Sequence, residues 1–117
     1  MAIRKTVENL ECGITVSMKV FGGKWKPCII DAIAKGHTRP SEMRRYIKEA
    51  PQRVIEMQLK ELEQHGMVRK INYGGFPLKT EYSLTEAAMA VLPIIDLLNE
   101  WGINNKDLVA PQLYAVE

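Results

Sequence analysis

The stretch Pro51–Thr85, PQRVIEMQLKELEQHGMVRKINYGGFPLKTEYSLT, decides the fold of this 117-residue chain. Its first part carries one stripe of apolar residues at helical spacing, namely Ile55, Leu59 and Leu62. Polar and charged side chains occupy the other faces of this segment. Pro51 suits the first turn of a helix and Gly66 suits its end. The pattern therefore predicts a helix over about residues 51–65.

Two short extended segments follow this helix, at residues 67–73 and 79–84. They are joined by Gly74-Gly75-Phe76-Pro77-Leu78, and the Gly-Gly and Pro residues predict a turn between two strands. A helix with a polar outer face that leads into a basic hairpin is typical of a winged helix-turn-helix. In that arrangement the helix enters the major groove of DNA and the hairpin, here about residues 67–84, lies beside it as the wing.

Three shorter helices are predicted upstream. The first covers residues 13–21 and ends at Gly22-Gly23, and the second begins near Pro27 and ends near Lys35. Its predicted inward residues are Trp25, Cys28, Ile29, Ala32 and Ile33. The third begins at Pro40, with Met43 and Ile47 facing inward and a basic outer face. This third helix and the central one have the short connection that a helix-turn-helix requires.

The last predicted helix is too apolar to be covered by one small domain. Thr85 is a suitable N-cap, and the apolar residues between 87 and 103 occupy more than one stripe. A second subunit is the natural cover for this surface. Pro93 predicts a kink or a restart near Leu92, and Gly102 and Asn104-Asn105 predict the end of the helix.

Length and composition fit one folded domain over residues 1–117, mainly α with a small β-hairpin (an α+β winged helix-turn-helix). Residues 1–11 and 104–117 are expected to be flexible or dimer-associated tails. The charge is polarised, with a balance of +6 over residues 1–53 and −4 over residues 54–117. That distribution fits one side facing phosphates, although chance clustering on a solvated surface would also explain it.

Several functional classes are disfavoured by the sequence. No apolar run approaches the ~20 residues that span a bilayer, and the N-terminus has no apolar signal core, so we expect a cytoplasmic, nucleoid-associated protein without a membrane partner. The spacing of Cys12 and Cys28 and the isolated His37 and His65 form no metal-binding set. Neither a catalytic constellation nor a phosphate-binding loop is present, so we expect neither an enzyme nor a cofactor.

Taken in order, several motifs resemble the HxlR-type (DUF24) family of winged helix-turn-helix transcriptional regulators. Cys12, Ile14 and the run MKVFGGKW at residues 18–25 are similar to that family's opening signature. LKELEQHGMV at residues 59–68 is similar to the exit of its recognition helix. EYSLT, Leu-Pro and Trp-Gly complete the match at residues 81–85, 92–93 and 101–102.

The resemblance implies a dimeric bacterial or archaeal DNA-binding regulator. It implies dimerisation through the N-terminal segment and the last helix, and a cysteine at the position of Cys12 senses oxidants or electrophiles in some family members. The chain departs from the family pattern at Gly13, where Pro is usual, and at Pro51, where a capping Ser is common. It also departs at Glu56, which replaces a small hydroxyl residue.

Two groups of residues are expected to contact double-stranded DNA. Gln52 and Arg53 begin the central helix and are predicted to read base edges, and Glu56 either weakens binding or accepts a hydrogen bond from cytosine N4. The expected phosphate contacts are Arg39, Arg44, Arg45, Lys60, Arg69, Lys70 and Lys79. Ordinary surface roles remain the alternative for these side chains, and Lys79 could instead protect an exposed strand edge.

Cys12 precedes a predicted helix whose N-terminal dipole would favour a thiolate, which makes a small oxidant or electrophile a candidate effector. The alternative is a small buried residue at the dimer interface. For the whole chain, the alternative to a dimeric regulator of a pseudo-palindromic operator is a winged-helix protein–protein interaction module without DNA binding. Glu56, Glu61 and Glu63, on or near the central helix, favour that alternative.

Overall fold

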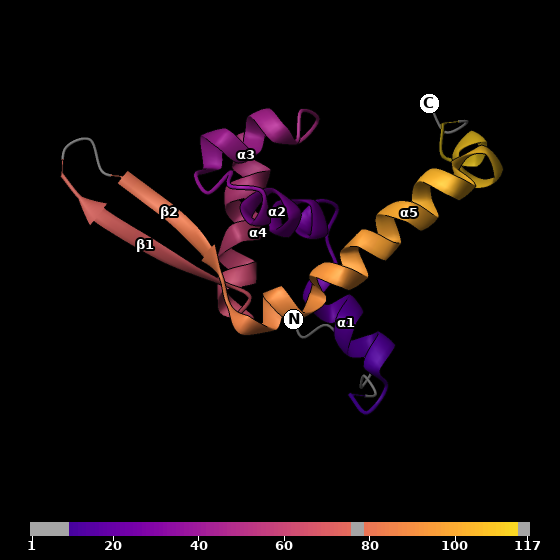
Figure 1. The fold of residues 1–117 in the computed structure, drawn as a ribbon, viewed down its shortest axis with the longest axis horizontal. Coiled ribbons are helices and arrows are strands. Elements are labelled where there is room, and N and C mark those ends of the chain that lie inside the picture. The colour runs from indigo at the N-terminus through magenta and orange to yellow at the C-terminus, as the bar shows by residue number, and fades with distance from the viewer. Residues whose placement is uncertain (1–9, 76–78, 115–117) are drawn as a thin grey trace, which may run out of the picture.

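The computed structural model describes residues 10–75 and 79–114, with side chains as far as Val109. Within these residues, the helices pack together into one body, and a two-stranded antiparallel hairpin projects from that body (Figure 1). The elements are α1 (Gly13–Phe21), α2 (Lys26–Ala34), α3 (Pro40–Tyr46), α4 (Gln52–Gln64), β1 (Val68–Gly74), β2 (Lys79–Leu84) and α5 (Glu86–Tyr114). The predicted fold class is confirmed. Most of the predicted N-terminal tail and the tip of the predicted turn lie outside the described residues.

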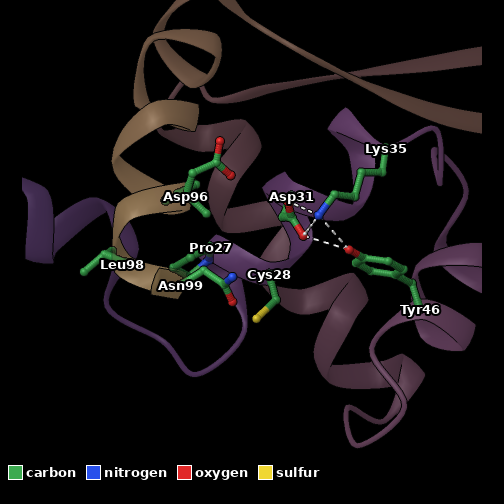
Figure 2. A pocket seen from close by; sticks show the side chains of 9 residues that line it. Pro27, Cys28, Asp31, Lys35, Tyr46, Asp96, Leu98 and Asn99 are labelled. Atoms are coloured by element: carbon green, nitrogen blue, oxygen red, sulfur yellow. Dashed lines mark hydrogen bonds and ion pairs between the residues drawn. The ribbon is translucent and has the colours of Figure 1, made fainter. Parts of the chain in front are cut away.

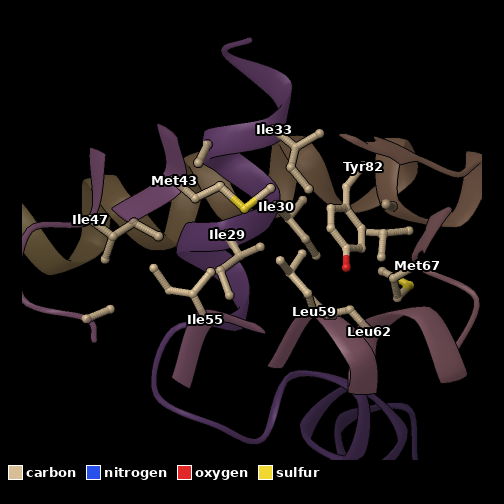
Figure 3. Packing of buried hydrophobic residues seen from close by; sticks show 14 of the residues in the cluster. Ile29, Ile30, Ile33, Met43, Ile47, Ile55, Leu59, Leu62, Met67 and Tyr82 are labelled. Carbon is tan, nitrogen blue, oxygen red and sulfur yellow. The ribbon is translucent and has the colours of Figure 1, made fainter. Parts of the chain in front are cut away.

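Helix α2 lies at the centre of the hydrophobic core, in contact with α3, α4, α5 and β2. Its Ile29 and Ile30 are completely buried. Met43 of α3, Leu59 of α4 and Tyr82 of β2 join them in one continuous cluster (Figure 3). The core therefore holds the helices and the base of the hairpin in one body.

The central helix α4 forms as the apolar stripe predicts, with Ile55, Leu59 and Leu62 all completely buried. Pro51 lies one position earlier than predicted, at the N-cap, where it provides no side-chain cap. Its φ of −64° and ψ of 147° are values that proline adopts readily. Gly66 follows the helix with a φ of +72°, a left-handed conformation that glycine adopts without strain.

The start of α3 is fixed by Glu42. Its Oε1 atom accepts hydrogen bonds from the backbone N–H groups of Thr38 and Arg39, both at 3.1 Å. Met43 and Ile47 are buried, as predicted, and Ala50 is buried in the connection to α4. Helices α3 and α4 contact each other and form the predicted helix-turn-helix pair.

The hairpin is anchored at its base. Its strands pair from Val68 opposite Leu84 to Gly74 opposite Lys79, with a register irregularity between Asn72 and Gly74. The Tyr82 N–H donates to the Thr38 carbonyl at 2.9 Å, which ties β2 to the turn between α2 and α3. The wing is therefore held against the helical body from one side.

The predicted N-cap of α5 is confirmed, but its predicted end is wrong. Thr85 Oγ1 accepts from the Ala88 N–H at 3.4 Å. The helix passes through Pro93 without a restart and continues past Gly102 to Tyr114. Pro93 is exposed and removes only one N–H donor, and the Asn105 amide donates to the Trp101 carbonyl at 2.9 Å within the helix.

The inward prediction for Cys28 is also wrong, because this residue is exposed. Ile30, which the predicted stripe omits, is completely buried instead. The reason is that α2 packs against neighbours on more than one side. Its buried surface is therefore wider than one stripe, and Cys28 falls at its edge beside α5.

Large apolar side chains remain exposed on α1 and α5. Ile14 of α1 is 76% exposed, and Leu97 and Trp101 of α5 are 63% and 58% exposed. The other exposed apolar residues of these helices are Val16, Met18, Met89, Ile94, Leu98, Ile103, Leu108 and Val109. The excess apolar surface predicted for the last helix is therefore confirmed. No helix among the described residues has the length and apolar character needed to cross a membrane.

Candidate nucleic-acid interface

The outer face of α4 carries the side chains predicted to meet base edges. Gln52, Arg53, Glu56 and Lys60 are all exposed. Gln52 Nε2 donates to Glu56 Oε2 at 3.1 Å, so these two side chains form one polar unit across a turn of the helix. Among residues 10–75 and 79–114, no hydrogen bond engages the other oxygen of either side chain, so each can still accept one.

A groove of about 430 Å³ lies between α4 and the hairpin. Glu56, Lys60 and Glu63 line it from α4, and Lys70 and Thr80 line it from the strands. The groove therefore brings together three of the predicted DNA contacts, Glu56, Lys60 and Lys70. The carboxylates of Glu56 and Glu63 would repel DNA phosphates, but they can accept hydrogen bonds from base amino groups.

Tyr82 also lines the groove, and its side chain is buried. Burial is the main cause that raises the pKa of its phenol, and the carboxylates of Glu63 and Glu56 raise it further. The phenol is therefore neutral near pH 7, where it can donate a hydrogen bond.

The predicted phosphate contact Arg39 is partly engaged within the protein. Its Nε atom lies 3.6 Å from Glu81 Oε2, and the Thr38 hydroxyl donates to the same oxygen at 2.8 Å. The Thr38 hydrogen bond is the main cause that lowers the pKa of Glu81, followed by a hydrogen bond from Tyr73. Arg39 is therefore exposed to solvent and at the same time links the start of α3 to strand β2 of the wing.

The remaining predicted phosphate contacts lie on other parts of the same elements. Arg44 and Arg45 are exposed on α3. Arg69 is exposed on β1 opposite Ser83, and Lys79 begins β2 near the hairpin tip. None of these four lines the groove between α4 and the hairpin.

Two residues of α4 that contribute to this site were not identified from the sequence. Met57 is exposed on the outer face, where an apolar group can contact a thymine methyl group. Gln58 is buried, and its Oε1 accepts from the Trp25 N–H at 3.0 Å. The polar identity of Gln58 masked its burial, because its partner is distant in sequence.

Cys12 is the N-cap residue of α1 and is only partly covered by other atoms. A hydrogen bond from the Thr15 side chain is the main cause that lowers its pKa, and the N–H groups of Thr15 and Ile14 lower it further. The two N–H groups belong to the first turn of α1, where a helix N-terminus favours an anion. The lowered pKa agrees in direction with the expectation from the position of Cys12 before a helix, although the main cause is the Thr15 side chain.

A family model described as HxlR-like helix-turn-helix matches residues 20–109 of the chain. The chain belongs to the HxlR-like helix-turn-helix family. An uncharacterized HTH-type transcriptional regulator of Halalkalibacterium halodurans is 39% identical over 104 residues, covering 88% of this chain and 90% of the relative. Another, from Methanothermobacter thermautotrophicus, is 38% identical over 91 residues, covering 78% and 70%.

Solved structures agree with this HxlR-like assignment. The reduced form of the redox regulator HypR is 36% identical, covers 86% of this chain and 99% of its own, and gives a TM-score of 0.77. Reduced YodB from B. subtilis is 26% identical, with coverages of 85% and 96% and a TM-score of 0.66. The predicted winged helix-turn-helix is confirmed, and this HxlR-like protein is a DNA-binding transcriptional regulator.

Proposed function

We propose that this HxlR-like regulator binds a pseudo-palindromic operator as a homodimer, with α4 of each subunit in the major groove and the hairpin beside it. The observation that carries the proposal is the exposed polar face of α4, which continues into the groove shared with the hairpin. In such a dimer the two copies of α4 lie about one DNA turn apart, roughly 34 Å, or a multiple of it.

Base recognition is assigned to the first turns of α4. Arg53 is exposed there and can pair bidentately with guanine. Gln52 and Glu56 act as the polar unit described above, and its acceptor oxygens suit the amino group of cytosine.

Phosphate binding is assigned to the basic residues around this face. These contacts position the protein without specifying sequence. The assigned residues are Arg39, Arg44, Arg45, Lys60, Arg69, Lys70 and Lys79, all of which are exposed.

The second subunit is assigned to the apolar surfaces of α1 and α5. Ile14, Leu97 and Trp101 would each leave more than half of a large apolar side chain in water in a monomer. Contiguous apolar surface of this kind marks a protein interface. Both helices lie on the far side of the body from the hairpin, so a dimer through them leaves the DNA face open (Figure 1).

A thiol-based response is assigned to Cys12. Its thiolate would attack an electrophilic carbon, forming a C–S bond while the displaced electron pair takes a proton from water. It could equally attack hydrogen peroxide, in which case an S–O bond forms, the O–O bond breaks, the sulfur is oxidised to a sulfenate and the second oxygen leaves as water. HypR is called a redox regulator in both its reduced and its oxidized form, and YodB is known in reduced and diamide-treated forms. The lowered pKa of Cys12 supports the same role here.

Fluorescence anisotropy tests the operator. The full chain is titrated into labelled duplex from upstream of its own gene and into a scrambled duplex, each at several salt concentrations. We expect tight binding to the first duplex, with log affinity falling against log salt by about 0.9 per phosphate contact. Equal, weak binding to both duplexes would contradict an operator at that position, and other upstream regions would be tested in the same way.

The same titration distinguishes the alternative of a protein-interaction module. Of the three carboxylates that favour this alternative, Glu61 is ion-paired with Lys26, whereas Glu56 and Glu63 line the groove. Strong loss of DNA binding by the Arg53→Ala, Lys60→Ala double variant would count against the alternative.

A further inference from the structure

A second cleft lies on the other side of the body, where α5 leaves the core. Ile95 is the last buried apolar residue of α5 within the described side chains. Beyond it, a space of about 410 Å³ opens between α5, the outer face of α2 and the end of α3 (Figure 2). Clefts of roughly 300–1,000 Å³ are typical of small-ligand sites. We name this space the junction cleft, lined by Cys28, Asp31, Lys35, Tyr46, Asp96 and Asn99 among others.

One wall of the junction cleft is held together by an ion pair and hydrogen bonds within the chain. Lys35 Nζ lies 2.9 and 3.0 Å from the two carboxylate oxygens of Asp31 and donates to the Tyr46 hydroxyl at 3.1 Å. That hydroxyl donates to Asp31 Oδ2 at 2.9 Å, which closes a triangle of interactions. The Tyr46 ring also stacks on His37, with ring centroids 4.7 Å apart. The charges of Asp31 and Lys35 cancel within this wall.

The opposite wall carries an unmatched negative charge. Asp96 lies on the exposed part of α5, and no hydrogen bond or ion pair joins its carboxylate to another residue in the described ranges. Between the walls, Pro27 and Ile95 provide apolar surface. Cys28 lies at the mouth of the cleft with its side chain partly in contact with neighbouring atoms, and this burial is the main cause that raises the pKa of its thiol, followed by the carboxylates of Asp31 and Glu49. The thiol is therefore neutral near pH 7, which disfavours a covalent ligand.

We propose that the junction cleft binds a small organic cation with an apolar body, its ammonium group at Asp96 and its body over Pro27 and Cys28. An ammonium group would give the Asp96 carboxylate the partner that it lacks in the chain. The apolar body would cover the exposed side chain of Cys28 and the half-buried ring of Pro27.

Such a ligand would contact both the DNA-binding body, through α2, and the helix assigned to the dimer, through α5. It would therefore bias the angle between them and change the spacing of the two copies of α4. This regulatory consequence rests on the proposed function, whereas the binding site itself does not.

The test uses three probes with similar bodies, namely 2-phenylethylamine, 2-phenylethanol and 3-phenylpropionate. Each is titrated into the full chain without DNA, and backbone amide shifts are followed by NMR. We expect the amine to shift the amides of Cys28, Tyr46, Asp96 and Asn99, and to bind at least about fivefold more tightly than the alcohol, because one close ion pair contributes that much. The carboxylate should bind more weakly than both.

Asp96→Asn should weaken the amine about fivefold and leave the alcohol unchanged. Asp107→Asn is the matched control, since Asp107 is an exposed carboxylate of the same helix that does not line the cleft. Equal affinities for the three probes, shifts elsewhere, or equal effects of the two variants would overturn the site. Binding of the amine without any change in operator affinity would keep the site and overturn its regulatory role. A protein that binds no operator would overturn the proposed function alone.

Discussion

The Lys26 ammonium group lies 2.7 Å from Glu61 Oε1, and the lysine side chain is only 3% exposed. Lys26 begins α2 and Glu61 lies on α4, so this ion pair joins the central helix of the core to the helix assigned to the major groove. The hydrogen bond between Gln58 and the backbone of Trp25 lies beside it. Together these contacts fix the position of α4 relative to α2.

Loss of Glu61 should destabilise the fold more than loss of Lys26. Glu61→Ala leaves a buried ammonium group without its partner, and we expect the free energy of unfolding to fall by about 2 kcal/mol, a moderate value because Glu61 is half exposed. Lys26→Met removes the buried ammonium group, while the Glu61 carboxylate stays hydrated because it is half exposed. This variant should therefore change the free energy of unfolding by less than ~1 kcal/mol. Urea unfolding measures both, with Glu63→Ala, an exposed carboxylate of the same helix, as the control.

The same pair makes stability depend on acid pH. The Lys26 hydrogen bond is the main cause that lowers the pKa of Glu61 from its ordinary value of 4.5. A carboxyl group with a lowered folded-state pKa stabilises the protein above its unfolded-state pKa, and this contribution is lost as pH falls through the folded value. The stability difference between wild type and Glu61→Gln should therefore shrink below pH 4.5. A difference that stays constant from pH 7 to pH 3 would contradict this assignment.

Arg53 and Lys60 should affect DNA binding in different ways. Arg53→Ala removes a bidentate base contact and should weaken binding to the operator by roughly 5- to 150-fold, with little change for scrambled duplex. Lys60→Ala removes a phosphate contact and should weaken both complexes similarly while reducing the salt slope by about 0.9. Anisotropy titrations at four salt concentrations measure these effects. The reverse pattern would exchange the two roles.

Glu56 should determine one base of each half-site. Gln52 Nε2 donates a hydrogen bond to Glu56 Oε2 at 3.1 Å. The two side chains therefore present acceptor oxygens that favour cytosine at that position. Glu56→Gln supplies a donor and an acceptor together and should shift the preference towards adenine. Sequencing the duplexes that each protein selects from a randomised pool detects the shift. An unchanged preference would place Glu56 outside base recognition.

Cys12 should react before Cys28 with iodoacetamide at neutral pH. The pKa of Cys12 is lowered from 9.0 and that of Cys28 is raised from 9.0, so Cys12 has the larger thiolate fraction at pH 7.5. Mass spectrometry after short exposures should find Cys12 modified first. Hydrogen peroxide should then change operator affinity about 5- to 150-fold in wild type and in Cys28→Ser, but not in Cys12→Ser. Identical responses of wild type and Cys12→Ser would rule out Cys12 as the sensor.

Replacing Leu97 and Trp101 with Asp should disrupt the dimer. These exposed side chains lie one helical turn apart on α5. Because burial of each large apolar side chain contributes about 1.5–3 kcal/mol, the dissociation constant of the dimer should rise by at least roughly a hundredfold. Size-exclusion chromatography with light scattering measures the mass, and Glu100→Ala, on the same helix, should behave as wild type. A dimeric double variant would assign the interface to another surface.

Local sequence patterns were sufficient for most of the fold. The buried stripe of α4, its glycine end and the paired strands each depend on residues a few positions apart. The same holds for the N-cap Thr85, which contacts Ala88 within the first turn. The order of the family motifs along the chain then indicated a winged helix-turn-helix, and the match to the HxlR-like family model confirms it.

Patterns were insufficient where a residue's environment comes from distant segments. Cys28 looked like a core residue on one stripe, but the position of α5 leaves it beside a cleft. Gln58 and Lys26 are polar residue types that are usually exposed, yet both are buried here because Trp25 and Glu61 provide their partners. Asn105 was predicted to end the helix because asparagine is common at helix ends. Its side-chain amide instead donates a hydrogen bond to the Trp101 carbonyl within the helix.

The sequence by itself determined that the chain is a winged helix-turn-helix with a polar reading face and excess apolar surface on its last helix. Those features depend on periodicity and on local backbone preference, which act over a few residues. Only the tertiary structure decided which charges face solvent, which are paired across elements, and where the grooves lie. Burial and pairing arise when segments far apart in the chain pack together, and side-chain type alone does not specify that packing.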